Sequence, residues 1–461
     1  MSMHARLRLA RLANAFLLSL LPLLPPLPHL PLLSAQSIVI THAVVIDGNG
    51  AAPIEDGTVV IRDGKILAVG SARTVTPPAA AQVIDARGKV VMPGLADMHV
   101  HLTGGWDGEA VDFLGYRRYL NSLLYAGVTT VLDTGNNQPY ILQLRQEVAA
   151  GRLLGPRIYC AGGLIDGPDP LWPPISFAVS SAAQVPRLVR QQKADRVDIL
   201  KAYHGLSVPI LATLVAEGRK DSLRVFVDQG QRNGSADLLR VGIAAWAHTP
   251  RFLSEEALAL MVERRVHTIT TLVVSETGTT RRFAQPAFMD DPLFKDTQPP
   301  WFIEDLKRHA AAILAPEAKA RTDAALSRLQ SAFRIVKRLH DAGLLLAAGT
   351  DAPYPGDIQG EGLHRELELL VEAGLTPLQA ITVATKNAAI LMNAEREWGT
   401  LEPGRTANVL IVNGRPDRTI GDTRKLDTVI LAGRVLNRQS LKFDASTDPG
   451  FRVGSSAAEH D

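Results

Sequence analysis

Eight short runs rich in Val, Ile and Leu recur between residues 90 and 348, and longer stretches of helical composition separate them. Short β-branched runs are typical of buried strands, and strands that alternate with helices form parallel sheets. Eight such units in succession predict an α/β fold, a (β/α)8 TIM barrel. The runs are residues 90–101, 127–132, 157–160, 197–201, 223–227, 243–247, 268–273 and 344–348.

The first run ends in two histidines, His99 and His101, which a single residue separates. Successive side chains of a strand point to opposite faces, so both imidazoles should point to the same side. Neutral imidazole nitrogens bind zinc at about 2.0–2.1 Å. The pair therefore indicates half of a metal site, with two structural histidines at a strand end as the alternative.

Other polar side chains stand at the ends of later runs. In a TIM barrel the active site lies where the carboxyl ends of the strands open into loops, so these side chains are candidates for one shared site. Besides the two histidines, the candidates are Lys201, Asp228, His248 and Asp351.

These motifs together resemble the amidohydrolase superfamily, in particular its imidazolonepropionase-like and prolidase-like branch. The resemblance extends over about residues 38–436. It rests on the segment 93–101, the Gly-Val-Thr-Thr turn at 127–130, Lys201, His248, the Gly-Thr-Asp run at 349–351, and later segments at 363–367, 372–377 and 402–404.

The resemblance implies a metal-dependent hydrolase that acts on a carbon–nitrogen bond. By position, it implies that Lys201 is carboxylated and bridges two metal ions, and that Asp351 both binds metal and shuttles the proton. The remaining implied metal ligands are His99, His101 and His248.

One position departs from the family's pattern, because Asp228 stands where the fifth strand usually ends in histidine. A carboxylate oxygen is an acceptable zinc ligand, although aspartate is shorter than histidine. We expect the cofactor to be a divalent metal, Zn²⁺ by its ligand types, while the sequence leaves one or two ions open.

Amide hydrolysis at neutral pH needs a strong nucleophile, and a divalent metal lowers the pKa of its bound water from about 16 to about 7. Asp351 can then accept the proton and return it to the leaving amine. Tyr203 is a candidate to polarise the scissile carbonyl, and His204 is a candidate to contact substrate. A packed aromatic and a histidine at the rim are the respective alternatives.

An amide, peptide or lactam hydrolase is the function that this set of residues favours. A lactonase or other ester hydrolase is a close alternative, because the same nucleophile attacks either carbonyl. Asp228 raises another alternative, a weakly active or non-catalytic relative that binds a small ligand.

In the long loop after the seventh run, Arg281 and Arg282 could bind a substrate carboxylate or form a solvated pair of charges.

Composition agrees with one large enzyme for a small-molecule substrate. The chain is 46% hydrophobic and its formal net charge is only +2, which gives no indication of nucleic acid binding. A homo-oligomer is left open.

Short strands are predicted on both flanks of the barrel, including a hairpin around Asp63 and Gly64. We predict that residues 36–92 and 398–440 form one small β-sandwich domain beside a barrel of residues 93–397. The tail at 441–461 is predicted to be disordered.

The N-terminus combines arginines with an apolar run over residues 13–33, followed by Ser34 and Ala35. This pattern predicts a signal peptide over residues 1–35 and a periplasmic or secreted protein. Prolines interrupt the apolar run, so a stable membrane anchor is not expected.

The ligand set predicts the metal content. We expect the purified protein to contain about one to two equivalents of zinc or a similar divalent ion, measured by elemental analysis. Replacing His99 and His101 together with alanine should lower the metal content, while circular dichroism should show a folded chain. A metal-free protein from metal-supplemented cultures would contradict the prediction.

Overall fold

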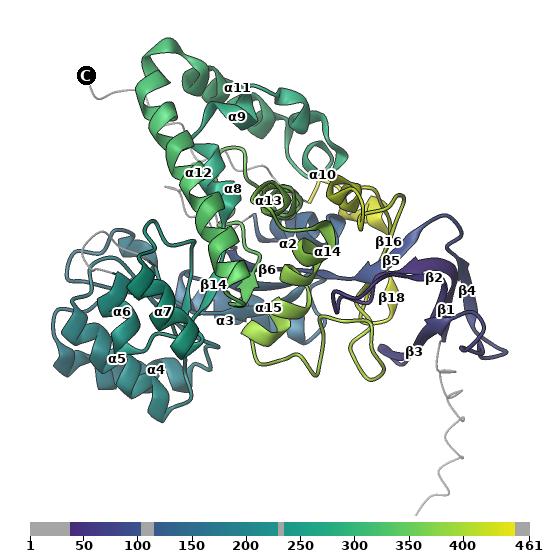
Figure 1. Cartoon of the computed structure of the whole chain (residues 1–461), viewed down its shortest axis with the longest axis horizontal. Helices are drawn as coiled ribbons and strands as arrows, with labels where there is room; N and C mark the ends of the chain where they lie inside the picture. The colour runs from purple at the N-terminus through teal and green to yellow at the C-terminus, as the bar shows by residue number, and fades with distance from the viewer. Residues whose placement is uncertain (1–36, 103–114, 229–234, 448–461) are drawn as a thin grey trace, which may run out of the picture.

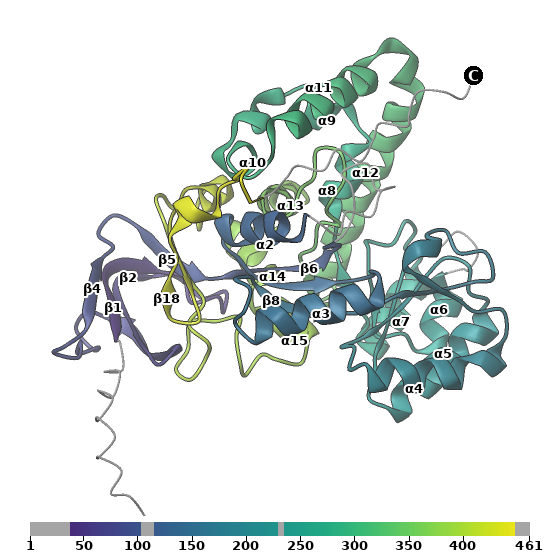
Figure 2. The same ribbon diagram turned by 180° about the vertical axis from the view of Figure 1, so that it is seen from behind.

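The computed structural model describes residues 37–102, 115–228 and 235–447. A sheet built from both flanks of the chain lies on one side, and α4 (Val185–Ala194) to α7 (Glu255–Arg264) lie on the other (Figures 1 and 2). The helices α9 (Thr280–Phe283) and α11 (Pro300–Leu314) project from the centre. The predicted signal peptide and residues 448–461 of the predicted tail lie outside the described residues.

Two parallel sheets form the centre of the fold, which confirms the predicted α/β class. Every predicted run of the barrel contains a strand that pairs in parallel with its neighbour. One sheet has the order β6 (Leu95–Val100), β7 (Val128–Asp133), β8 (Arg157–Cys160). The other has the order β10 (Ser176–Ala178), β9 (Leu164–Asp166), β11 (Leu200–Ala202), β12 (Val225–Val227), β13 (Ala245–Trp246), β14 (His267–Ile269), β15 (Leu346–Ala347).

Backbone hydrogen bonds connect these two sheets. On one side, the Asp198 N–H donates to the Cys160 carbonyl over 2.9 Å. On the other, the Met98 N–H donates to the Ala348 carbonyl over 2.9 Å. A parallel bridge between Val100 and Ala352 lies beside the second link. The ends of β6 and β15 are therefore held next to each other.

Helices follow most of the parallel strands and cover the sheets. Their buried apolar residues form a large core together with the strands. The remaining α-helices are α2 (Tyr116–Tyr125), α3 (Gln138–Ala149), α5 (Val208–Lys220), α6 (Ser235–Val241), α8 (Leu272–Thr277), α10 (Pro292–Lys295), α12 (Lys319–Asp341), α13 (Glu361–Glu372), α14 (Pro377–Val383) and α15 (Lys386–Leu391). Short 3-10 helices are η1 (Pro173–Ile175), η2 (Ala182–Gln184), η3 (Pro286–Asp290), η4 (Pro316–Ala318), η5 (Ile420–Arg424) and η6 (Arg438–Leu441).

The seventh run was expected to be a strand over residues 268–273, and this extent is wrong. The strand β14 ends at Ile269, Thr271 adopts a left-handed conformation with φ 45°, and α8 begins at Leu272. The following segment, expected to be a loop, contains short helices with local caps such as Asp291, whose carboxylate accepts from the Leu293 N–H over 2.8 Å. Helices of four residues are too short to show a helical period in the sequence.

The flanks of the chain form one sheet of eight strands. The predicted hairpin is confirmed: β2 and β3 pair antiparallel through Asp63 and Gly64, with φ 51° and 75°. The strands are β1 (Ile38–Val45), β2 (Ile54–Arg62), β3 (Lys65–Ser71), β4 (Gln82–Asp85), β5 (Val90–Pro93), β16 (Val409–Val412), β17 (Leu426–Leu431) and β18 (Arg434–Val435).

The first apolar run divides between the two parts of the fold. Its beginning, β5, pairs with β1 and β16 in the flank sheet, whereas β6 begins the parallel sheet. Gly94 lies at this junction, where the chain passes against Thr129. A Cβ atom at Gly94 would overlap the Thr129 side chain. The glycine therefore allows the close approach of the junction to β7.

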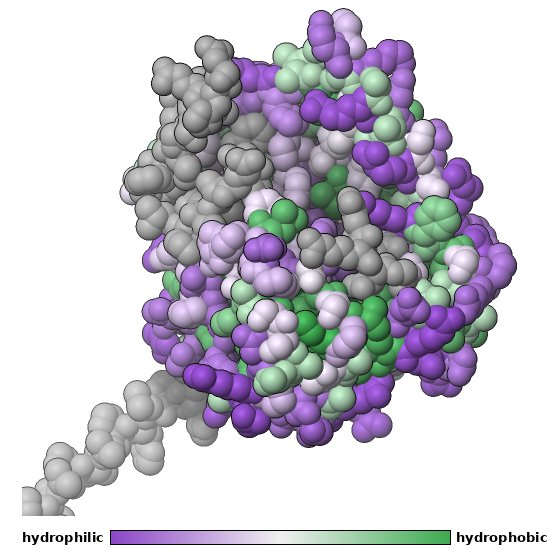
Figure 3. Space-filling model, turned by 90° about the vertical axis from the view of Figure 1, so that its left-hand side faces the viewer, coloured by the Kyte–Doolittle hydropathy of each residue, from purple (hydrophilic) through white to green (hydrophobic). Residues whose placement is uncertain are grey.

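No helix within the described ranges is both long and apolar enough to cross a membrane. In the space-filling view, hydrophilic side chains make up much of the visible face, and hydrophobic side chains gather near its middle (Figure 3).

The Gly94 junction yields a stability prediction. Gly94→Ala should lower the free energy of unfolding by about 1–3 kcal/mol, because an added methyl group in a packed site forces its neighbours to shift. Thermal denaturation followed by circular dichroism would measure the loss. Gly421→Ala is the control, since the nearest atom to its Cβ, Oε1 of Glu368, lies 3.8 Å away. Equal melting temperatures for the two variants would contradict the prediction.

Candidate active site

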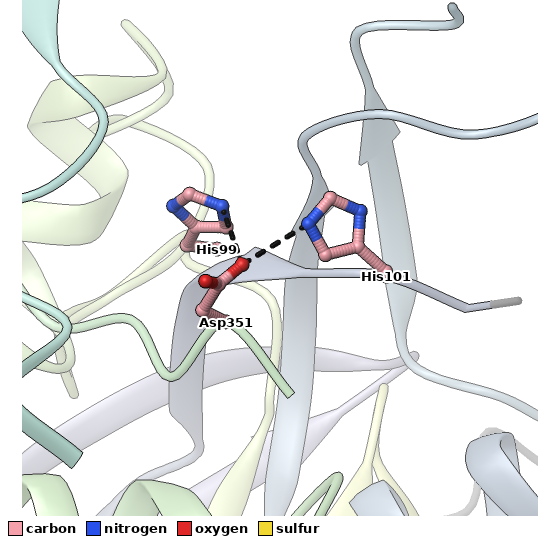
Figure 4. Close-up of side chains that lie close together, drawn as sticks. All are labelled: His99, His101 and Asp351. Atoms are coloured by element: carbon pink, nitrogen blue, oxygen red, sulfur yellow. Dashed lines mark hydrogen bonds and ion pairs between the residues drawn. The ribbon is translucent and has the colours of Figure 1, made fainter. Parts of the chain in front are cut away.

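Two histidines and one aspartate meet at the adjoining ends of β6 and β15. His99 and His101 come from the carboxyl end of β6, and Asp351 follows β15. Oδ1 of Asp351 lies 3.1 Å from Nε2 of His99 and 3.1 Å from Nε2 of His101 (Figure 4). One nitrogen or oxygen from each of the three residues lies within 4.8 Å of the others, which is compact enough to hold a metal ion.

Backbone carbonyls determine which imidazole nitrogens carry protons. Nδ1–H of His99 donates to the Ala247 carbonyl over 2.6 Å, and Nδ1–H of His101 donates to the Gly135 carbonyl over 2.7 Å. In the neutral imidazole, a proton on Nδ1 leaves Nε2 with a free lone pair. Both lone pairs then point toward the Asp351 carboxylate.

This arrangement fits a cation. A lone pair on Nε2 of His99 and a carboxylate oxygen repel each other at 3.1 Å unless a positive charge lies near them. Burial would lower the pKa of His101, but its hydrogen bond to Asp351 raises it overall, so a proton on His101 or a metal ion would supply that charge. Burial, together with the charge of Lys201, lowers the pKa of His99 to about 3, so this imidazole is neutral at physiological pH. Burial would raise the pKa of Asp351, but His99, His248 and His101 lower it overall, which keeps the carboxylate ionised.

The other predicted residues lie beside this group. His248, at the end of β13, has its Nε2 3.0 Å from Oδ2 of Asp228 and 4.0 Å from Oδ2 of Asp351. Its ring lies 4.4 Å from that of His99 between centroids. Nζ of Lys201, on β11, lies 3.7 Å from Oδ2 of Asp228. The structure thus brings all six predicted metal-site residues into one cluster.

Asp228 reaches the cluster although its side chain is short. It is buried, and its two oxygens have different neighbours. Oδ1 accepts a hydrogen bond from Nε2 of His204 over 2.8 Å, while Oδ2 faces His248 and Lys201. Burial would raise the pKa of Asp228, but His248, His204 and Lys201 lower it well below its usual value. Asp228 is therefore a buried carboxylate whose charge depends on its neighbours.

Lys201 is only 1% exposed, and burial lowers the pKa of its amine against the opposing effect of Asp228. A lowered pKa increases the fraction of neutral amine, which is the nucleophilic form. The environment of Lys201 is thus suited to reaction with carbon dioxide as well as to ion pairing.

Several supporting residues were not recognised from the sequence. The Asp97 carboxylate accepts from the Thr350 N–H and Oγ1–H over 3.0 and 2.7 Å, and from the His99 N–H over 3.2 Å. Thr271, in its left-handed conformation, lies 2.8 Å from Nδ1 of His248 through its hydroxyl. These contacts hold β6, β15 and the His248 ring in place. Their residue types are common in loops, so only spatial neighbourhood distinguishes them.

A cavity of about 630 Å³ opens over the cluster. Tyr203 and His204 line it, with stacked rings whose centroids lie 4.3 Å apart. The Tyr203 hydroxyl accepts from the Trp172 indole N–H over 3.1 Å. Other residues that line the cavity include Leu171, Thr249, Arg251, Val274, Ser275, Arg328, Ser331 and Tyr354.

Arg281 and Arg282 do not line this cavity, so both interpretations of the pair are wrong. Arg281 binds Glu372 through two hydrogen bonds of 2.7 Å each. Arg282 is buried and binds Glu361. Both arginines therefore connect helices rather than bind substrate or face only solvent.

A model of the amidohydrolase family matches residues 90–213 and 297–436, which together are more than half of the chain. The chain belongs to the amidohydrolase family. The family that the sequence motifs resemble is thereby confirmed. The described cluster of His99, His101 and Asp351 could hold a metal ion.

Individual relatives show how far the similarity extends. An enamidase from Eubacterium barkeri is 31% identical over 106 residues, which cover 22% of this chain and 26% of that protein. The chain thus spans about a quarter of this relative. An imidazolonepropionase from Geobacillus thermodenitrificans is 25% identical over 80% of this chain and 89% of its own.

A solved structure supports the shared fold. It is a Xaa-Pro dipeptidase with methionine bound in its active site, and it superposes with a TM-score of 0.69 at 22% identity. The superposition covers 87% of this chain and 100% of the dipeptidase. At this identity the likeness concerns the fold.

Measuring the metal content of variants tests whether Asp228 binds an ion. If Asp228 binds an ion, Asp228→Ala should reduce the metal stoichiometry by about one and impair turnover, whereas Asp228→His should retain the ion. Inductively coupled plasma spectrometry on dialysed protein measures the stoichiometry. Asp169→Ala, at an exposed aspartate, is the control. Unchanged metal content and turnover in Asp228→Ala would make Asp228 a bystander.

Proposed function

We propose that this protein hydrolyses an amide, peptide or lactam carbon–nitrogen bond in a small molecule with the help of one or two divalent metal ions. The observation that carries the proposal is the convergence of six candidate residues in one cluster, of which Asp228, His248 and Asp351 line one cavity. The cluster contains three imidazoles, two carboxylates and a buried lysine. A purely structural role would not require so many potential metal ligands. A protein that only bound a small ligand would have no need for this set.

The metal would be held by His99, His101, His248 and Asp351, with Lys201 and Asp228 completing the site. When bound, the ion supplies a water molecule of lowered pKa and an electrophile for the substrate carbonyl. Nitrogen and carboxylate ligands of this kind suit zinc. Asp351 is the residue placed to accept a proton from the attacking water and to return it to the leaving amine.

Lys201 is proposed to be carboxylated. Its neutral amine attacks carbon dioxide, a new N–C bond forms, and one proton leaves, so that the product is a carbamate anion. The complete burial of Lys201 supports this step, because burial favours the neutral amine. The carbamate has two oxygens and could bridge two ions. Mass measurement at raised bicarbonate would detect the added carboxyl group.

Tyr203 and His204 are proposed to act on the substrate. Both line the cavity, and the Tyr203 hydroxyl already accepts from Trp172, so its own proton can be donated to a substrate carbonyl. His204 is held by Asp228. This arrangement supports a positioning role for the pair beside the metal site.

The two parallel sheets are proposed to close as a single eight-stranded barrel. The hydrogen bonds from Asp198 to Cys160 and from Met98 to Ala348 support closure, because they join β8 to the residues just before β11 and β6 to the residues just after β15. The flank sheet is proposed to fold on itself as a small sandwich around its own apolar core, which includes Ile40, Val59 and Ile411.

Export is proposed from the N-terminal sequence alone. Arginines before an apolar run that ends in Ser34 and Ala35 support a cleaved signal peptide. Periplasmic or extracellular accumulation of a tagged chain would test it.

The proposed mechanism predicts the effect of one conservative change. Asp351→Asn keeps the shape of the side chain but cannot accept a proton, so turnover of any accepted amide should fall by about 10²-fold or more. The assay uses N-acyl amino acids, Xaa-Pro dipeptides, lactams and lactones with metal-loaded protein. Release of amine from no amide in this panel would contradict the proposed function, and selective opening of lactones would indicate an ester hydrolase.

The matched control is Asp357→Asn, in the same segment of the chain. Burial raises the pKa of Asp357 well above its usual value, which favours the neutral carboxyl, so replacement by an amide should change turnover little. Near-normal turnover in Asp351→Asn would remove Asp351 from the proposed mechanism.

A further inference from the structure

Thr271 has a strained backbone conformation beside His248, one of the candidate metal ligands. Its φ and ψ angles are 45° and 46°, which is the left-handed region. A β-branched residue rarely adopts this conformation, because its Cβ substituents crowd the backbone. Such strain persists only where the surroundings hold the residue, and it clusters at functional sites. Thr271 lines the cavity, and its Oγ1 lies 2.8 Å from Nδ1 of His248.

The Thr271 hydroxyl bears on which nitrogen of His248 can bind a metal ion. Nε2 of His248 lies 3.0 Å from Oδ2 of Asp228. A proton on Nε2 would be donated to that carboxylate and would leave no lone pair for an ion. A proton on Nδ1, donated to Oγ1 of Thr271, frees the Nε2 lone pair. Thr271 and Asp228 therefore favour opposite tautomers of His248.

Glu366 binds the chain on both sides of Thr271. It lies on α13 and is fully buried. Its Oε1 accepts from the hydroxyl of Thr270, and its Oε2 accepts from the N–H of Val273 over 2.8 Å. One carboxylate thus spans the strained residue, with a separate oxygen for the donor on each side.

The donors around Glu366 favour its ionised form. Burial raises the pKa of Glu366 to about 7, while hydrogen bonds from Thr270 and from the amides of Leu272 and Val273 oppose this rise. Hydrogen bonds to an ionised acceptor are stronger than those between neutral groups. The carboxylate is therefore the form that holds the two segments most firmly.

Thr270 also fixes the segment that follows His248. The N–H and Oγ1–H of Thr249 donate to the Thr270 carbonyl over 3.3 and 2.5 Å. The N–H of Thr270 donates to the carbonyl of Ala347 on β15 over 3.0 Å. A shift of Thr270 would therefore move both the residue after His248 and the Thr271 hydroxyl that faces the imidazole.

The other glutamates of α13 beyond its first turn and at its start pair with arginines, whereas Glu366 does not. Within the described parts of the chain, no ion pair engages Glu366, and its partners are a hydroxyl and backbone amides. Its contacts therefore serve the turn at Thr271 rather than the network of ion pairs. That network connects α13 to neighbouring segments through Glu361 and Arg282, Glu368 and Arg424, and Glu372 and Arg281.

We propose that Glu366 is a positioning residue for His248. By holding the chain before and after Thr271, it keeps this residue in the left-handed conformation that presents its hydroxyl to Nδ1 of His248. The hydroxyl accepts the Nδ1 proton, and Nε2 is left free to bind a metal ion. This inference rests on the proposed function, because it takes His248 as a metal ligand.

Three substitutions remove successive parts of this arrangement. Glu366→Gln replaces one accepting oxygen with a donating nitrogen, so the side chain can no longer accept from both donors through separate oxygens. Thr270→Val removes the donor to Oε1 and tests the same contact from its other side, should Glu366→Gln fail to fold. Thr271→Val keeps the branched shape and removes the hydroxyl that faces His248.

Two further variants serve as comparisons. Thr271→Ser restores a hydroxyl at the position that Thr271→Val leaves without one. Glu372→Gln is the matched control for Glu366→Gln, because it is the same exchange on the same helix at a residue that binds Arg281.

Two measurements report on His248 directly. Nuclear magnetic resonance of isotopically labelled histidine shows which ring nitrogen carries the proton, and the His248 signals are assigned by their absence in His248→Gln. A zinc titration against a competing chelator gives Kd for the ion. Both measurements use the full chain at about pH 8, where Glu366 is mostly ionised. The tautomer is recorded before zinc is added, and circular dichroism checks the fold.

We expect the wild type to carry the proton on Nδ1 of His248. Glu366→Gln, Thr270→Val and Thr271→Val should move it toward Nε2. Each should also weaken Kd for zinc by about 10- to 100-fold, the usual effect of losing a group that orients a metal ligand. Thr271→Ser should bind zinc more tightly than Thr271→Val, and Glu372→Gln should match the wild type in both measurements.

The outcomes separate the role of Glu366 from the proposed reaction. A proton on Nε2 of His248 in the wild type would overturn the positioning role. A wild-type tautomer in folded Glu366→Gln or Thr270→Val would do the same, even if zinc binding were weaker. The expected changes of tautomer and Kd, without release of amine from any amide, would support the positioning role and contradict the proposed hydrolase.

Discussion

The ionised carboxylate of Asp351, buried between imidazoles, is the interaction on which the site depends. His99 and His101 each donate Nδ1–H to a backbone carbonyl and present Nε2 to the same carboxylate oxygen at 3.1 Å. An ionised carboxylate in a buried position is unfavourable without a positive charge beside it. Backbone carbonyl groups at the ends of β-strands therefore orient the imidazoles. A divalent ion would stabilise the cluster that results.

A network of buried ion pairs supports the cavity wall around this site. Glu361 on α13 is fully buried and binds both Arg282 and Arg424, over 2.7 Å for the latter. Glu276 on α8 is also buried and binds Arg365. Each carboxylate is paired and hydrogen-bonded, as burial of a charge requires. Breaking one such pair leaves an uncompensated charge, so α8 and α13 are held together beside the cavity.

The two ends of the cavity have different chemical characters. Its base contains Asp228 and Asp351 with their imidazole and lysine neighbours, and its wall contains Arg251 and Arg328. Asp228 illustrates how position can replace residue type. Although it is shorter than the histidine that is usual there, its Oδ2 lies 3.0 Å from His248. A substrate that reaches from the wall to the base would experience both environments.

The sequence alone determined the parallel α/β units and most of the site, because His99 and His101 share one face of a strand and because Lys201, Asp228, His248 and Asp351 all follow apolar runs. Strand periodicity and strand-end position are local properties, so they can be recognised without coordinates. The tertiary structure decided which arginines line the cavity and which carbonyls orient the imidazoles. Arg281 and Arg328 are indistinguishable as surface-type residues in the sequence, yet one pairs with Glu372 and the other lines the cavity. Pairing depends on helices that are far apart along the chain, and only their packing brings the partners together.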